Sequence, residues 1–203
     1  EAALRLFAMS QPIGGTLAAT YLRGRAITPL SGVTALRYHP RCYYRPDEHS
    51  PTEIWPAMVA SVTDLAGRQT GAHRTWLAPD GSGKAPVETP RRAMGNLLGH
   101  GVRFGVAGEV LAAGEGIETV LSVRMALPRM PMLAALSAAH LAAILFPATL
   151  RRLYVLRDRD PAGDGARDNL IARAESAGIE AVSVSPVEED FNDDLRRRGK
   201  AAL

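Results

Sequence analysis

Residues 153–163 read Leu-Tyr-Val-Leu-Arg-Asp-Arg-Asp-Pro-Ala-Gly, a short apolar segment followed by two closely spaced acids and a proline. A short apolar run bounded by polar residues predicts a buried strand. Pro161 suits the first turn of a helix and Gly178 suits the position after its end, so a helix should follow. Asp158 and Asp160 then lie directly beyond the strand, and their alternate spacing points both carboxylates the same way.

The same alternation of strand and helix extends through residues 109–203. Further strands are expected at 110–113, 132–136 and 179–184, and helices between Glu115 and about residue 127 and around 140–145. This order is typical of an α/β fold in which helices flank a central parallel sheet. The first half of the chain, by contrast, predicts a small α+β unit.

Three groups of acidic residues follow strands of the predicted parallel sheet. Glu115 follows the first strand, Asp158 and Asp160 follow the third, and the acidic run 188–194, which includes Asp190, follows the fourth. Functional groups gather beyond the carboxyl ends of parallel strands, so we expect these side chains to converge. Carboxylates packed together repel one another unless a cation neutralises them. Because Mg²⁺ prefers oxygen ligands and bridges to phosphate, the sequence predicts a Mg²⁺ or Mn²⁺ site for phosphoryl or nucleotidyl transfer.

Taken singly, each acid also has a structural interpretation. Glu115 lies between two glycines and could be a turn residue. Asp160 precedes Pro161 and would be a good N-cap. Glu118 would be stabilised by the dipole of the helix whose first turn it occupies. Only the convergence of several such acids in one unit favours the metal site.

The first half of the chain is basic. Residues 1–108 contain 12 Lys and Arg and 7 Asp and Glu, whereas residues 109–203 contain 12 and 14. A basic half beside an acidic half is typical of an enzyme that binds a polyanion with one part and a metal ion with the other. Ordinary surface charge would give the same numbers. The segment 36–44 mixes basic and aromatic residues, so it is either a nucleic-acid contact or a half-buried strand interrupted by a proline.

A β-hairpin is expected from residues 56–64 and 69–77, since both segments are rich in β-formers and a turn sequence separates them. A flexible loop at 80–86 follows and presents Lys84. The loop lacks the glycine spacing of a phosphate-binding P-loop, which argues against an ATPase.

The composition is that of an ordinary globular protein. Hydrophobic residues make up 46% of the 203 residues, and no apolar run is long enough to span a membrane. Cys42 is the only cysteine, which excludes an internal disulfide and a zinc finger within the chain and agrees with a cytoplasmic location.

The order of motifs strongly resembles the Toprim domain, which bacterial-type primases, topoisomerases, certain nucleases and recombination proteins share. The resemblance covers residues 109–199. The matching motifs are Gly-Glu115-Gly, Leu136-Ser137, Asp158-Arg-Asp160-Pro-Ala-Gly163 and Asp190-Phe-Asn192-Asp193, each after a predicted strand. The resemblance implies that Glu115, Asp158 and Asp160 are catalytic and hold the metal together with Asp190.

The basic half resembles the segment before the Toprim fold in DnaG-like bacterial primases and their phage and plasmid relatives. This implies a primase-like subdomain at 1–108 and a Toprim domain at 109–203. It also implies a set of residues that face the template or the incoming nucleotide, namely Lys84, Arg74 and Arg68, with Glu118 assisting Glu115. Asn192 departs from the family pattern, where a further aspartate is typical, and Asp193 could replace it as a metal ligand.

We therefore expect the core of a DNA primase, which synthesises a short RNA primer from nucleoside triphosphates on single-stranded DNA. A zinc-binding module or a helicase would lie outside this chain. Two alternatives remain open: a Toprim nuclease with the same metal ligands, and a non-catalytic nucleic-acid-binding module. A topoisomerase is disfavoured, because no tyrosine has a recognisable nucleophile context.

Overall fold

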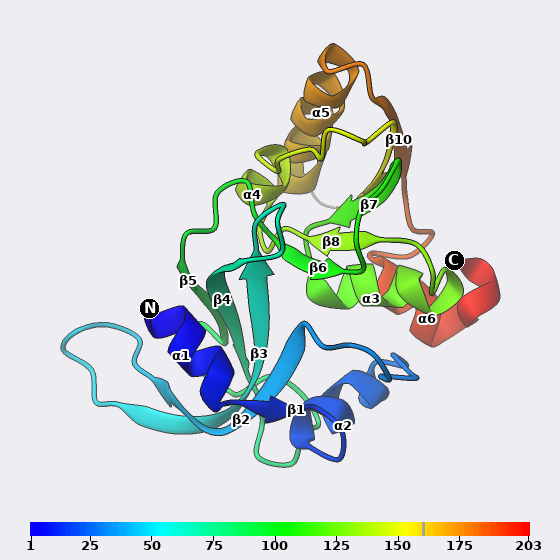
Figure 1. Ribbon diagram of the computed structural model, residues 1–203. Helices are drawn as coiled ribbons and strands as arrows, with labels where there is room; N and C mark the ends of the chain where they lie inside the picture. The colour runs from blue at the N-terminus through cyan, green and yellow to red at the C-terminus, as the bar shows by residue number, and fades with distance from the viewer. Residues whose placement is uncertain (160) are drawn as a thin grey trace.

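The computed structural model describes residues 1–159 and 161–203, and the strands of these residues form two sheets (Figure 1). The first sheet is antiparallel and has the order β1-β2-β3-β4-β5. Its strands are β1 (Gln11–Pro12), β2 (Leu36–Tyr44), β3 (Glu53–Thr63), β4 (Gln69–Trp76) and β5 (Arg91–Gly95). Helix α1 (Ala2–Met9) packs on one face of this sheet, and α2 (Leu17–Gly24) contacts the core on the other.

The second sheet has the order β10-β9-β7-β8-β6 and confirms the predicted parallel arrangement. Strands β7 to β10 are parallel, and β6 pairs antiparallel with β8. The strands are β6 (Val102–Phe104), β7 (Val110–Gly114), β8 (Met132–Ala134), β9 (Arg152–Leu156) and β10 (Glu180–Val184). The expected division at residue 108 therefore places β6 with the first half by sequence, although this strand completes the second sheet.

Helices cover both faces of the second sheet. On one face α4 (Ala138–Ala142) and α5 (Pro161–Ser176) pack on the sheet through an apolar cluster that includes Leu141 and Leu170. On the other face lie α3 (Ile117–Ala126) and α6 (Phe191–Arg198), followed by the short 3-10 helix η1 (Lys200–Ala202). The core beneath α3 and α6 also contains side chains of α2 and β3, so one continuous core joins the two sheets.

Several local predictions are confirmed. The hairpin is β3–β4, and segment 36–44 forms strand β2. Its register with β3 shifts between His39 and Cys42, on either side of Pro40, because proline has no N–H to donate to a neighbouring strand. None of the helices in the described ranges is long and apolar enough to cross a bilayer.

Helix α6 was not predicted. The sequence analysis predicts no helix after the fourth strand of the parallel sheet, but residues 191–198 are helical. Asp190 caps this helix by accepting a hydrogen bond of 2.8 Å from the backbone N–H of Asp193. Acids in the first turn and arginines in the last turn complement the helix dipole. Only Phe191 and Leu195 bury apolar side chains, so few apolar residues mark this helix in the sequence.

Candidate active site

The carboxyl ends of the parallel strands open onto a polar pocket of about 360 Å³. Its lining includes Glu115 after β7, Asp158 after β9 and Asp190 after β10, together with Glu118 from the first turn of α3. The full lining is Arg25, Lys84, Arg91, Glu115, Gly116, Glu118, Thr119, Asp158, Arg159, Glu189 and Asp190. Four acids that the sequence singled out thus share one pocket, whereas Asp160 lies outside the described residues.

The donor chemistry of the pocket fits a hard cation. Carboxylate oxygens are the ligands that Mg²⁺ and Mn²⁺ prefer, and Mg²⁺ usually takes only one or two of them from the protein. Within residues 1–159 and 161–203, no three His, Cys, Asp or Glu side chains lie close enough together to form a metal site. Asp158 is oriented by Thr119, whose Oγ1 donates to Oδ1 at 3.2 Å. The pocket therefore offers separate carboxylates and not a closed protein cage.

The opposite wall of the pocket is cationic and comes from the first half of the chain. Lys84 lies in the loop after β4, Arg91 begins β5, and Arg25 directly follows α2. Sequence reasoning identified Lys84 but missed Arg25 and Arg91. No local signal marks these two arginines, because each lies at the end of an element and far in sequence from the acids.

Glu118 is the acid of the pocket that hydrogen-bonds to the first half of the chain. The Tyr21 hydroxyl donates a hydrogen bond of 2.6 Å to Glu118 Oε1. Burial opposes ionisation of Glu118, but Lys84, the Tyr21 hydroxyl and Arg25 outweigh it, so the pKa of Glu118 lies below its usual range. Burial, reinforced by the negative charge of Glu118, raises the pKa of Tyr21. Tyr21 thus stays a neutral donor beside an ionised carboxylate.

Lys84 is partly removed from water in the same pocket. Burial lowers its pKa, Glu118 acts in the opposite direction, and Arg91 and Arg25 lower it further. A cluster of cations that repel one another is suited to an anionic ligand, because binding relieves this repulsion.

The other two predicted nucleic-acid contacts lie elsewhere. Arg68 is at the turn between β3 and β4, where it pairs with Asp64 at 2.9 Å, and its side chain is 81% exposed. Arg74 lies on β4 with its guanidinium over the Trp76 ring, 4.8 Å from the ring centre. It lines a separate apolar cavity beneath α1. Of the three predicted basic residues, only Lys84 lines the acidic pocket.

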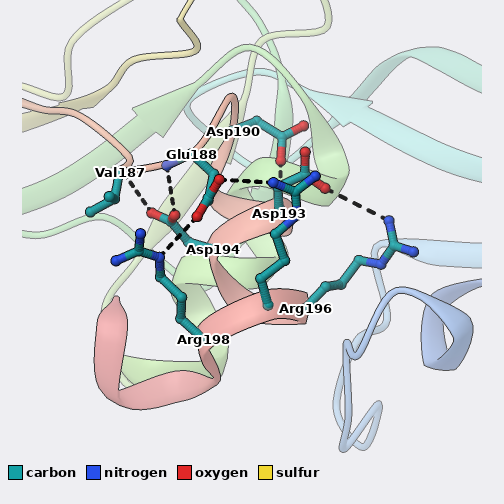
Figure 2. Close-up of polar contacts among 8 residues, drawn as sticks. Val187, Glu188, Asp190, Asp193, Asp194, Arg196 and Arg198 are labelled. Carbon is teal, nitrogen blue, oxygen red and sulfur yellow. Dashed lines mark hydrogen bonds and ion pairs between the residues drawn. The ribbon is translucent and has the colours of Figure 1, made fainter.

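The acidic run around Asp190 divides into residues with different contacts (Figure 2). Asp193 does not line the pocket; its carboxylate lies 3.7 Å from Arg196 on the same helix. Asn192 is 1% exposed and hydrogen-bonds to Arg25 and Ser122. Asp194 is equally buried and accepts from two backbone N–H groups of the preceding loop.

Residues 1–104 match the family described as "Domain of unknown function (DUF7146)", and residues 110–201 match the family described as "Toprim domain". No curated protein has significant sequence similarity to the chain.

Solved primase structures share the fold across both halves. The zinc-binding and RNA polymerase domains of the Aquifex aeolicus primase match at 18% identity with a TM-score of 0.68, covering 98% of this chain and 58% of that one. A DNA primase domain from Pseudomonas aeruginosa matches at 13% identity and 0.66, covering 99% and 75%. The RNA polymerase domain of Mycobacterium tuberculosis DnaG, in complex with a DNA oligomer, matches at 16% and 0.60, covering 99% and 76%.

The chain thus spans little more than half of the Aquifex structure, and at these identities the likeness shows a common fold. The Toprim fold implied by the order of motifs is confirmed, and it is preceded by an antiparallel sheet subdomain. The chain belongs to the DUF7146 family, with a Toprim domain in its second half and the fold of a DnaG-type primase core.

Proposed function

We propose that this chain is the catalytic core of a DNA primase, which joins ribonucleotides into a short primer on single-stranded DNA in a metal-dependent reaction. The observation that carries the proposal is the composition of the pocket. Acids at the strand ends of the Toprim sheet face Arg25, Lys84 and Arg91 from the antiparallel half. A nucleoside triphosphate with its metal ion needs both kinds of charge in one place.

The acids of the pocket, Glu115, Asp158 and Asp190 with Asp160, would supply the carboxylate ligands of Mg²⁺ or Mn²⁺, one or two for an ion. The bound ion would neutralise charge on the triphosphate and activate the attacking hydroxyl of the primer. Lys84, Arg25 and Arg91 bind the phosphates of the incoming nucleotide from the other wall. Glu118 favours the charged form of Lys84 and accepts a hydrogen bond from the Tyr21 hydroxyl.

The template would follow the basic half of the protein. Single-stranded DNA binds to grooves through its phosphates, so we expect an affinity that falls steeply with salt. A zinc-binding module and a helicase would act with this core from outside the chain; the Aquifex structure includes a zinc-binding domain, and a phage relative is a primase-helicase.

The experiment is a primer-synthesis assay with single-stranded DNA, labelled ribonucleotides and Mg²⁺ or Mn²⁺. The wild-type chain is expected to yield short extended products. The double variant Asp158→Asn, Asp160→Asn is expected to yield none while binding DNA with nearly unchanged affinity. Asp168→Asn is the matched control, because Asp168 is an exposed acid on α5 that pairs with Arg167.

Each product pattern has a distinct meaning. Extension that persists in the double variant would contradict the assigned role of the two acids. Metal-dependent cutting of the DNA without nucleotides would identify a Toprim nuclease instead. DNA binding with neither product would identify a non-catalytic module.

A further inference from the structure

Two buried polar side chains of helix α6 connect this helix to segments that carry residues of the candidate active site. Asn192 and Asp194 are each 1% exposed and do not line the pocket. Their neighbours Phe191 and Leu195 fill the apolar core between α3 and α6. A polar side chain buried in an apolar core is stable only if its hydrogen bonds are satisfied. The hydrogen-bond partners of these two residues therefore indicate which segments they fix in place.

Asn192 holds Arg25. Its Nδ2 donates to the backbone carbonyl of Arg25 at 2.9 Å, and its Oδ1 accepts from Arg25 Nη1 at 3.2 Å. The second proton of Nδ2 is donated to Ser122 Oγ on α3 at 3.0 Å. Arg25 also lies over the Tyr21 ring, 5.0 Å from its centre. One amide therefore fixes both the backbone and the guanidinium of a cation that lines the pocket.

Asp194 holds the loop that carries Asp190. Its two oxygens accept from the backbone N–H groups of Val187 and Glu188, both at 2.8 Å, as Figure 2 shows. The loop is further connected to the segment after β9, because the carbonyl of Glu189 accepts from the N–H of Arg159 at 3.1 Å. Asp194 thus fixes the position of the loop segment that immediately precedes Asp190.

We propose that α6 positions the two opposite charges of the active site independently: Asn192 positions the cation Arg25, and Asp194 positions the acid Asp190. This inference rests on the proposed function, since it takes a metal ion and a nucleoside triphosphate as the ligands of the pocket. Asn192 and Asp194 are positioning residues and touch neither ligand. Because their partners differ, loss of each residue should weaken the binding of a different ligand.

The test measures binding by the full chain, without catalysis. Mn²⁺ alone is titrated by electron paramagnetic resonance, and GTP is titrated by calorimetry at saturating Mn²⁺. Asn192→Ala is expected to weaken GTP binding about tenfold and to leave Mn²⁺ binding unchanged, because Arg25 loses its support. Asp194→Asn is expected to weaken Mn²⁺ binding about tenfold, as loss of a supporting contact behind a ligand does, and to leave GTP binding at saturating Mn²⁺ unchanged.

Matched controls separate positioning from general damage to α6. Arg196→Gln removes the 3.7 Å ion pair with Asp193 without touching Asn192, and Arg198→Gln removes the exposed 3.0 Å ion pair with Glu188 without touching Asp194. Both controls should bind Mn²⁺ and GTP like the wild type. Thermal unfolding identifies variants that do not fold, and Asn192→Ser and Asp194→Ser then replace them under the same criteria.

The crossed pattern supports the inference. Equal weakening of both ligands by either variant, or no weakening by either, overturns it, as does a wild type that binds neither Mn²⁺ nor GTP. A wild type that binds both ligands with the crossed pattern and yet makes no primer would defeat the proposed function and leave the positioning roles intact.

Discussion

The hydroxyl of Tyr21 donates a 2.6 Å hydrogen bond to Glu118 Oε1, across 97 residues of sequence. Tyr21 lies on α2 of the antiparallel half and Glu118 on α3 of the Toprim half. Arg25, directly after the end of α2, and Ser122, one turn further along α3, are joined through Asn192. The two halves are therefore connected at the wall of the pocket through neighbouring helical turns.

Tyr21→Phe should destabilise the protein. The substitution removes the donor and leaves the half-buried Glu118 carboxylate with fewer partners, so we expect the free energy of unfolding to fall by about 1–3 kcal/mol. Urea denaturation measures the change. Tyr43→Phe is the control, since Tyr43 is 68% exposed, and it should have the midpoint of the wild type. Equal midpoints for all three proteins would show that the Tyr21 contact contributes nothing to stability.

Stability should fall between pH 6.5 and about 4 because of His73. Burial holds the pKa of this histidine at about 4, with Arg91 and Arg74 adding to the effect and Glu118 opposing it. Unfolded histidine has a pKa near 6.5, so below that pH the unfolded chain binds a proton that the folded chain does not. The resulting loss is about 3 kcal/mol once the pH reaches the folded pKa.

Urea unfolding at several pH values measures this dependence. His73→Gln should show a flatter profile between pH 6.5 and 4, whatever its absolute stability. His49→Gln, at an exposed position, should keep the wild-type slope. The assignment to His73 is wrong if its variant keeps that slope as well.

Lys84→Met should weaken binding of the triphosphate, whereas Arg68→Met should not. Lys84 lines the pocket, and losing a charge-assisted contact to phosphate costs about 1.5–3 kcal/mol, or roughly tenfold or more in affinity. Arg68 pairs with Asp64 at the far hairpin turn. Calorimetric titration with GTP and Mn²⁺ compares the two variants. Similar losses in both would mean that the hairpin turn also contacts the nucleotide.

Ala26→Gly should stabilise the protein. Ala26 follows α2 with φ of 60°, and the N–H of Ile27 donates to the carbonyl of Leu22, as in a glycine-terminated helix end. An L-residue in this conformation costs about 1 kcal/mol that glycine avoids. Thermal or urea unfolding should show a gain of that size. Ala172→Gly, in the exposed interior of α5, should instead lose about 1 kcal/mol; a loss in both variants would contradict the strain at Ala26.

Most of the Toprim half follows from local sequence patterns. Buried parallel strands are short continuous apolar runs, and β7, β8 and β9 lie where such runs occur. Turn and helix signals between these strands mark where each strand begins and ends. Helix α6 was missed because its stability depends on a cap, its charges and two core contacts, and only the contacts leave a hydrophobic pattern.

The sequence by itself determined the position of the acids. A carboxylate directly after a parallel strand lies at the functional edge of the sheet, and Glu115 and Asp158 follow this rule, whereas Asp190 lies further beyond β10 at the start of α6. This holds because the residue at which a strand ends is a local property of the sequence. Asp160 obeys the same pattern but lies outside the described residues.

Only the tertiary structure decided which cations face those acids. Side chains alternate between the two faces of a strand, so on β4 the ring of His73 senses the charges of Glu118 and Lys84 while its neighbour Arg74 lines the cavity under α1. Which face meets the Toprim half depends on packing between segments far apart in sequence. The same packing brings Arg25 to the pocket and leaves Arg68 outside it.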